Sequence, residues 1–128
     1  MKLNAVVVFS LLFIFLLFGC LQGPTGQAGN QFSQPVAPQN LIASSTQGKI
    51  VLKWNPTPGA SFATIYRESQ GVPKTDIGNV QFSGNETAED FSFTDIQISR
   101  GTLYTYCVTQ TANNIESTCS NDITITAR

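Results

Sequence analysis

The chain has 128 residues, a charged fraction of only 12% and a net charge of −1. This length accommodates one domain of ordinary size and excludes two large ones. The seven basic residues form no cluster, which argues against nucleic-acid binding because that binding depends on neutralising phosphates. The chain contains no histidine. It therefore lacks the commonest general base, the commonest metal ligand and every Ser-His-Asp or Cys-His arrangement.

The first 20 residues are much more apolar than the rest of the chain. One positive charge at Lys2 precedes an apolar run over residues 5–18 that only Ser10 interrupts. A charged start and a short apolar core are typical of a secretory signal. As a helix this run would span about 21 Å, which is less than the roughly 30 Å core of a bilayer. We therefore expect residues 1–19 to be a signal peptide that directs export.

The apolar run ends at Leu17-Phe18-Gly19-Cys20. This segment resembles the lipobox of prokaryotic lipoproteins, although Phe18 departs from the small or β-branched residue usual there. The resemblance implies cleavage before Cys20 and attachment of lipid to its sulfur. Two acyl chains would hold the protein stably on a membrane, since each buried CH₂ contributes about 0.8 kcal/mol. The alternatives are an ordinary signal peptide and an uncleaved signal anchor with an incidental cysteine.

The three cysteines fit this interpretation. If Cys20 carries lipid, Cys107 and Cys119 remain as a pair. An exported chain occupies an oxidising compartment, so we expect a disulfide between them. A redox-active pair is disfavoured, because the spacing is not C-x-x-C and no neighbouring charge would lower a thiol pKa.

Residues 20–37 comprise Cys20 and an uncharged stretch rich in Gly, Pro, Gln and Ser. This composition is typical of a flexible linker, which would hold a domain just clear of a membrane surface.

From Gln39 onward, short apolar stretches alternate with turn residues, and Thr, Ile, Val, Phe and Tyr are prominent. This pattern favours β-strands and shows no helical period. Seven short strands in about 90 residues predict an all-β chain folded as an antiparallel β-sandwich. The expected strands cover residues 40–43, 49–54, 63–67, 77–82, 91–94, 103–110 and 122–127.

Two strands show clear alternation. The first places Trp54 at its end on an apolar face, where it predicts a large core residue. The second places Tyr104 and Tyr106 on one face and Cys107 on the opposite face. Pairing Cys107 with Cys119 across a hairpin would turn the isoleucines at 123 and 125 outward. We therefore expect a β-bulge at residues 120–122 that restores their inward orientation.

The order of motifs over residues 38–128 resembles a fibronectin type III domain. This resemblance implies a seven-stranded immunoglobulin-like sandwich, in which Tyr104 would be the tyrosine-corner residue whose hydroxyl bonds nearby backbone. Arg100 stands where the family usually has proline, and residues 70–89 match little. Another immunoglobulin-like sandwich is the alternative fold. The resemblance rests on PQNL at 38–41, I-x-L-x-W-x-P at 50–56, IYR at 65–67, FTD at 93–95, I-x-x-GT-x-Y-x-Y-x-V at 98–108 and SNDITI at 120–125.

No catalytic or cofactor-binding pattern is present in the sequence. The only adjacent carboxylates, Glu89 and Asp90, would point to opposite faces of a strand and could not flank one bond. No calcium loop or glycine-rich phosphate loop occurs. Asp95 is expected to cap local backbone as a turn residue. Asn85 begins an N-x-T sequon, a site of glycosylation if the host glycosylates exported proteins.

We therefore expect a lipid-anchored protein on the extracellular side of the cell membrane, not an enzyme, with no cofactor, metal or small-molecule substrate. Its single fibronectin type III-like module would bind a protein partner, as in adhesion, or act as a structural spacer. The alternative is a carbohydrate-associated module of the cell envelope. Sugar binding favours exposed aromatic rings, for which Tyr66 is the best candidate because Trp54 is expected to be buried.

Overall fold

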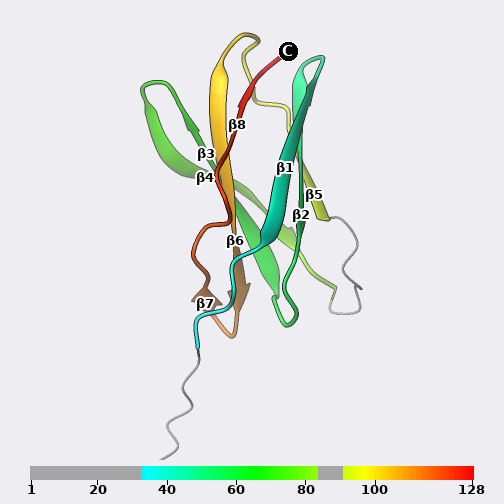
Figure 1. The fold of residues 1–128 in the computed structure, drawn as a ribbon, viewed down its shortest axis with the longest axis vertical. Coiled ribbons are helices and arrows are strands. Elements are labelled where there is room, and N and C mark those ends of the chain that lie inside the picture. The colour runs from blue at the N-terminus through cyan, green and yellow to red at the C-terminus, as the bar shows by residue number, and fades with distance from the viewer. Residues whose placement is uncertain (1–32, 84–90) are drawn as a thin grey trace, which may run out of the picture. The chain divides into compact units, whose positions relative to one another are not determined.

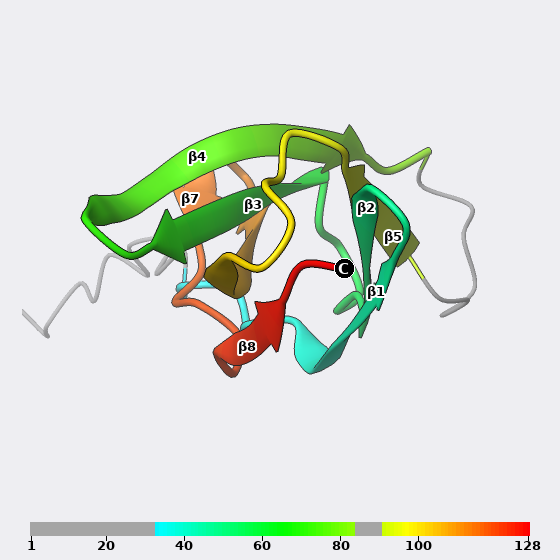
Figure 2. The ribbon, with the colours of Figure 1, turned by 90° about the horizontal axis from the view of Figure 1, so that it is seen from above.

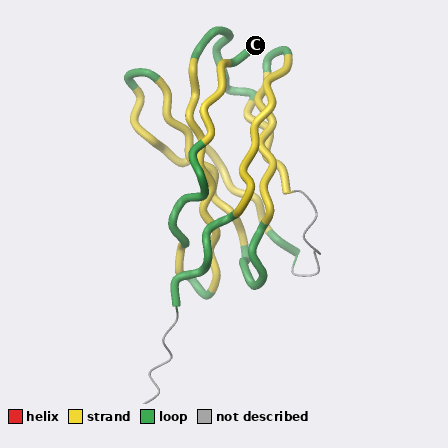
Figure 3. The backbone as a smooth tube through the Cα atoms, in the orientation of Figure 1, coloured by secondary structure: helices red, strands yellow, loops and turns green. Residues whose placement is uncertain are grey.

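The computed structural model describes residues 33–83 and 91–128 (Figure 1). The expected signal peptide, the lipidation site at Cys20, most of the expected linker and the sequon at Asn85 lie outside these residues. Within them the chain forms strands and loops without a helix (Figure 3). The described part accordingly contains no helix long and apolar enough to cross a membrane.

The strands form two antiparallel sheets that pack as a sandwich, with β1, β2 and β5 gathered on one side (Figure 2). The first sheet has the order β1-β2-β5, and the second has the order β4-β3-β6-β7, with β8 also paired to β6. The strands are β1 Gln39–Thr46, β2 Lys49–Asn55, β3 Phe62–Ser69, β4 Val72–Gln81, β5 Phe91–Asp95, β6 Leu103–Ala112, β7 Ile115–Glu116 and β8 Ile123–Thr126.

All seven expected strands are present, and the all-β sandwich is confirmed. The structure adds the two-residue strand β7 and begins β4 at Val72, five residues before the expected start. The first half of β4 is exposed on both faces, so its sequence does not alternate between apolar and polar residues. Without that alternation, local sequence carries little signal for a strand.

The core lies between the sheets and contains the predicted faces of β2 and β6. Trp54 is 1% exposed, and Tyr106 and Val108 are fully buried opposite it. The indole Nε1 of Trp54 has no hydrogen-bond partner, so this residue contributes through apolar burial. The outer face of β6 is also covered at Cys107, which is 0% exposed although the sequence placed it on a solvated face.

The segment between β7 and β8 changes register against β6, as expected for residues 120–122. A disulfide joins Cys107 to Cys119, yet the neighbouring Tyr106 pairs with Ile123. The intervening residues 120–122 are therefore extra relative to β6 and interrupt the strand. Ile123 consequently packs against the core instead of facing solvent. The expected irregularity is confirmed, and it spans three residues, more than a simple bulge.

This irregular segment also closes the open edge between the sheets. The side-chain amide of Asn121 donates to the carbonyl oxygen of Leu41 at 3.1 Å, and its Oδ1 accepts from the Leu41 amide at 3.2 Å. Leu41 lies where the pairing of β1 with β2 is irregular. The Asn121 side chain thus provides β1 with the pair of hydrogen bonds that a neighbouring strand would supply.

A buried polar network links the sheets at one end of the core. Asp95, at the end of β5 and 4% exposed, accepts from Arg67 Nη1 at 2.7 Å and from the Tyr106 hydroxyl at 2.8 Å. Its other oxygen accepts from the Gln97 amide at 2.9 Å, which is the expected local cap. Burial and the hydrogen bond to Asp95 raise the pKa of the Tyr106 hydroxyl, so Tyr106 acts as a neutral donor.

At the other edge of the sandwich, a glycine in β4 allows the two sheets to approach each other closely. Gly78 has φ +153°, and the pairing of β3 with β4 shifts beside it. A Cβ atom at this position would lie 3.0 Å from Cε2 of Phe93 in the opposite sheet. Glycine therefore satisfies both an unusual backbone conformation and a close approach between the sheets.

We predict that Gly78→Ala lowers the free energy of unfolding by about 2–3 kcal/mol, since it combines backbone strain with the contact to Phe93. The control is Gly71→Ala, where φ is +78° and nothing lies near the added methyl group. Strain alone should cost the control about 1 kcal/mol. Urea denaturation measures both losses, and equal losses would exclude a contribution from the contact with Phe93.

Candidate functional site

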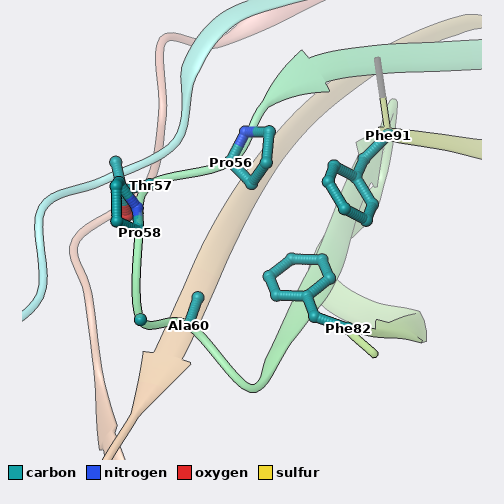
Figure 4. A pocket seen from close by; sticks show the side chains of 7 residues that line it. Pro56, Thr57, Pro58, Ala60, Phe82 and Phe91 are labelled. Atoms are coloured by element: carbon teal, nitrogen blue, oxygen red, sulfur yellow. The ribbon is translucent and has the colours of Figure 1, made fainter. Parts of the chain in front are cut away.

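A pocket lies beside the connection between β2 and β3 (Figure 4). Its volume is about 260 Å³. The connection supplies one wall, and two aromatic residues at the ends of β4 and β5 supply the other. The lining residues are Pro56, Thr57, Pro58, Gly59, Ala60, Phe82 and Phe91.

The aromatic wall is an extension of the core. The rings of Phe82 and Phe91 have centroids 4.6 Å apart and are tilted by 56°. Phe91 pairs with Trp54 across β2 and β5, so both side chains share the inward face. Both phenylalanines are half-buried and pack against the core. The pocket thus exposes the edge of a rigid aromatic cluster.

The opposite wall is held in place by a buried glutamine. Gln110 in β6 is 0% exposed. Its Nε2 donates to Thr57 Oγ1 at 3.1 Å, and its Oε1 accepts from the Thr57 amide at 3.0 Å. The prolines on either side of Thr57 further restrict the backbone. The pocket is therefore formed by a fixed loop, and binding a ligand there would order little additional chain.

The lining determines what this pocket can do chemically. None of the described lining side chains is charged, and their polar groups are a hydroxyl and backbone atoms. No group of three or more His, Cys, Asp or Glu residues that could hold a metal occurs in the described residues. The described lining therefore offers a ligand contact with aromatic and proline side chains, together with a hydroxyl and backbone groups.

The segment that leads into β1 contacts the same end of the domain. Gln34 Nε2 donates to the carbonyl oxygen of Glu116 at 3.0 Å, and Thr57 Oγ1 donates to the carbonyl oxygen of Val36 at 3.1 Å. Pro38 is among the fully buried residues. Contacts with the domain therefore begin within residues 34–37, which the sequence assigned to a flexible linker.

The described site residues from the sequence do not line this pocket, although Trp54 lies behind it as the pairing partner of Phe91. The Tyr104 hydroxyl accepts from the Ser99 amide at 2.9 Å, which is tyrosine-corner geometry. The Cys107–Cys119 disulfide lies on the outer face of β6, and Trp54 lies in the core. These residues have structural roles, and the structure does not bring them together into one site.

Tyr66, the aromatic residue considered for sugar binding, is engaged on the outer face of the second sheet. Its hydroxyl donates to Glu116 Oε1 at 2.9 Å, and Thr109 donates to the same oxygen at 2.6 Å. Partial burial and the hydrogen bond to Glu116 raise the pKa of Tyr66. With its hydroxyl occupied, Tyr66 offers a ligand mainly its ring.

Sequence reasoning missed Gln110, Phe82 and Phe91. Gln110 falls on the same face of β6 as Tyr106 and Val108, so the alternation of this strand was the signal that could have placed it inward, although a polar residue is not an obvious core residue. The two phenylalanines are separated by residues that match no motif. Of the pocket, only the β2–β3 connection had a signal in the sequence, since its Asn55-Pro56 and Pro58-Gly59 pairs mark a rigid turn.

Comparison with known proteins tests the resemblance to a family. No family model matches the chain. An Fn3-like protein from Clostridium thermocellum superposes with a TM-score of 0.60 and 28% identity, over 75% of this chain and 96% of that protein. The described domain has a fibronectin type III-like fold. A β-1,2-glucanase from Parabacteroides distasonis contains the same fold, with a TM-score of 0.59 and 23% identity over 72% of this chain and 12% of the glucanase.

This fibronectin type III-like chain also resembles part of a much larger enzyme. It is 29% identical over 82 residues to an amylopullulanase of Thermoanaerobacterium saccharolyticum. The match covers 62% of this chain but only 6% of the amylopullulanase. The similarity therefore concerns one small segment of that enzyme.

We predict that Gln110→Ala loosens the connection between β2 and β3. The variant leaves the Thr57 amide unpaired and opens a buried space, which should lower the free energy of unfolding by about 2–4 kcal/mol. Hydrogen exchange at Thr57 and its neighbours should accelerate more than exchange in β3. Thr57→Val, which keeps the hydrogen bond from the amide of residue 57 to Gln110 Oε1 and removes only the hydroxyl, is the matched control. Unchanged exchange in the alanine variant would contradict the anchoring role.

Proposed function

We propose that this protein is an exported lipoprotein, anchored through Cys20 on the extracellular side of the cell membrane, that displays a fibronectin type III-like module for protein binding or as a spacer. The lipobox-like ending of the apolar run at Cys20 carries the anchoring part of this proposal. The fibronectin type III-like fold supports a binding or spacing role over a catalytic one.

The geometry of the described domain is compatible with tethering from its N-terminal side. Residues 34–38 lie against the domain, so about 14 residues separate Cys20 from the first contact at Gln34. Fully extended, that stretch would reach no more than about 50 Å. The module would therefore be held close to the membrane surface.

Mass spectrometry of the protein purified from its native membrane tests the anchor. We expect an N-terminus at Cys20 that carries acyl chains, and loss of both the acyl chains and the cleavage before residue 20 in Cys20→Ala. Cys107→Ala is the control, because it also removes a cysteine but leaves the lipobox intact. An unmodified N-terminus at Met1 would refute lipid anchoring.

A second candidate function is association with carbohydrate at the cell envelope. The similarity to a segment of an amylopullulanase favours it. The uncharged, aromatic-walled pocket at the β2–β3 connection supplies a suitable surface, because sugar rings present apolar C–H faces that pack on aromatic rings. The ligand class consistent with this lining is a neutral polysaccharide.

Titration with pullulan and dextran tests this second function. Phe82→Ala should weaken binding about tenfold or more, and Ala60→Trp should do the same by filling the pocket without removing a core residue. Tyr66→Ala is the control on the outer sheet face. Loss of binding in the Tyr66 variant alone would show that sugar binds to the outer sheet face. Absence of binding by the unchanged protein would exclude this function.

A further inference from the structure

The end of the sandwich opposite the N-terminal segment has a different chemistry. The β1–β2 turn, the β5–β6 connection and residue 128 meet there (Figure 1). They enclose a pocket of about 440 Å³. It is lined by Gln47, Gly48, Ile98, Arg100 and Arg128.

Arg100 is placed by two sets of backbone contacts. The tyrosine corner holds the β5–β6 connection through the hydrogen bond from the Ser99 amide to the Tyr104 hydroxyl. Immediately after Arg100, the Gly101 amide donates to the carbonyl oxygen of Ala127 at 2.9 Å. The backbone on both sides of Arg100 is therefore fixed.

Arg128 is fixed from the other side of the pocket. Its amide donates to Ser45 Oγ at 2.8 Å, and its carbonyl oxygen accepts from the Gly48 amide at 3.0 Å. These contacts attach Arg128 to the β1–β2 hairpin. The two arginines thus reach one pocket from segments that the fold holds together, although they are far apart in the sequence.

Neither of these two arginines has an ion-pair partner among the described residues. The two ion pairs found among the described residues are Arg67 with Asp95 and Lys74 with Asp122, and neither involves the pocket. Both pocket arginines are exposed, as is the nearby Lys49. Guanidinium groups bind carboxylate and phosphate oxygens through paired N–H donors. Charge complementarity therefore selects an anionic ligand.

We propose that this pocket binds the oxyanion groups, carboxylate or phosphate, of an acidic polymer outside the cell, with Arg100 and Arg128 as the ligand-binding residues. This site lies at the opposite end of the domain from the apolar pocket and from the N-terminal segment, so it adds a separate binding function.

Binding of the full chain, purified in detergent, to immobilised polymers tests the proposal. The probes are polygalacturonate for carboxylate, polyphosphate for phosphate and dextran as a neutral polymer. We expect binding to one or both acidic polymers, little binding to dextran and weakening with added salt, because exposed charges are screened. The acidic polymer that binds identifies the source of the oxyanion.

Variants locate the binding. Removing both arginines (R100A/R128A) should weaken binding about tenfold or more, given the usual strength of hydrogen bonds to charged groups. Lys74→Ala, which removes a positive charge outside the pocket, should leave binding within about twofold of the unchanged protein. If the double alanine variant does not fold, Arg100→Gln and Arg128→Gln replace it. Undiminished binding by the arginine variants, equal binding to dextran, or no binding by the unchanged chain would overturn the proposal.

Discussion

The Asp95 carboxylate is the polar contact on which one end of this sandwich depends. It accepts hydrogen bonds from Arg67 in β3 and Tyr106 in β6, two strands of the opposite sheet. It accepts a third from the backbone amide two residues further along the chain. Buried charges are tolerated only with such partners. Burial lowers the pKa of Arg67, but its hydrogen bond and charge interaction with Asp95 raise it overall. The guanidinium also lies over the Tyr104 ring, 5.3 Å from its centroid, so the network supports the tyrosine corner.

The Cys107–Cys119 disulfide stabilises the opposite, outer face of β6. It holds the irregular segment 120–122 against the sheet, where a regular strand could not pair. From there Asn121 reaches Leu41 and joins the second sheet to the first. A small domain of this size buries limited apolar area, and such ties limit the conformations of segments that the core does not hold.

These constraints leave two ends of the domain with different surfaces. Near the N-terminal segment, Gln110 fixes a proline-rich connection beside two phenylalanines, and the result is a preformed apolar pocket. At the opposite end, the tyrosine corner and the pairing of residues 101–102 with Ala127 bring two arginines together. Loops on a rigid sandwich are free to vary without disturbing the core, which is why a fibronectin type III-like fold by itself specifies no ligand.

The sequence alone determined seven of the strands, apart from the first half of β4, together with the sheet class, the buried Trp54 and the register irregularity before β8. Each of these follows from local alternation or from the pairing of near neighbours. The sequence did not reveal the partners of Asp95, the contact of Gln110 with Thr57 or the convergence of Arg100 and Arg128. These depend on contacts between residues about 11 to 53 positions apart. A polar side chain has the same local pattern whether it faces water or a distant partner, so only the packing of the two sheets decided which groups meet.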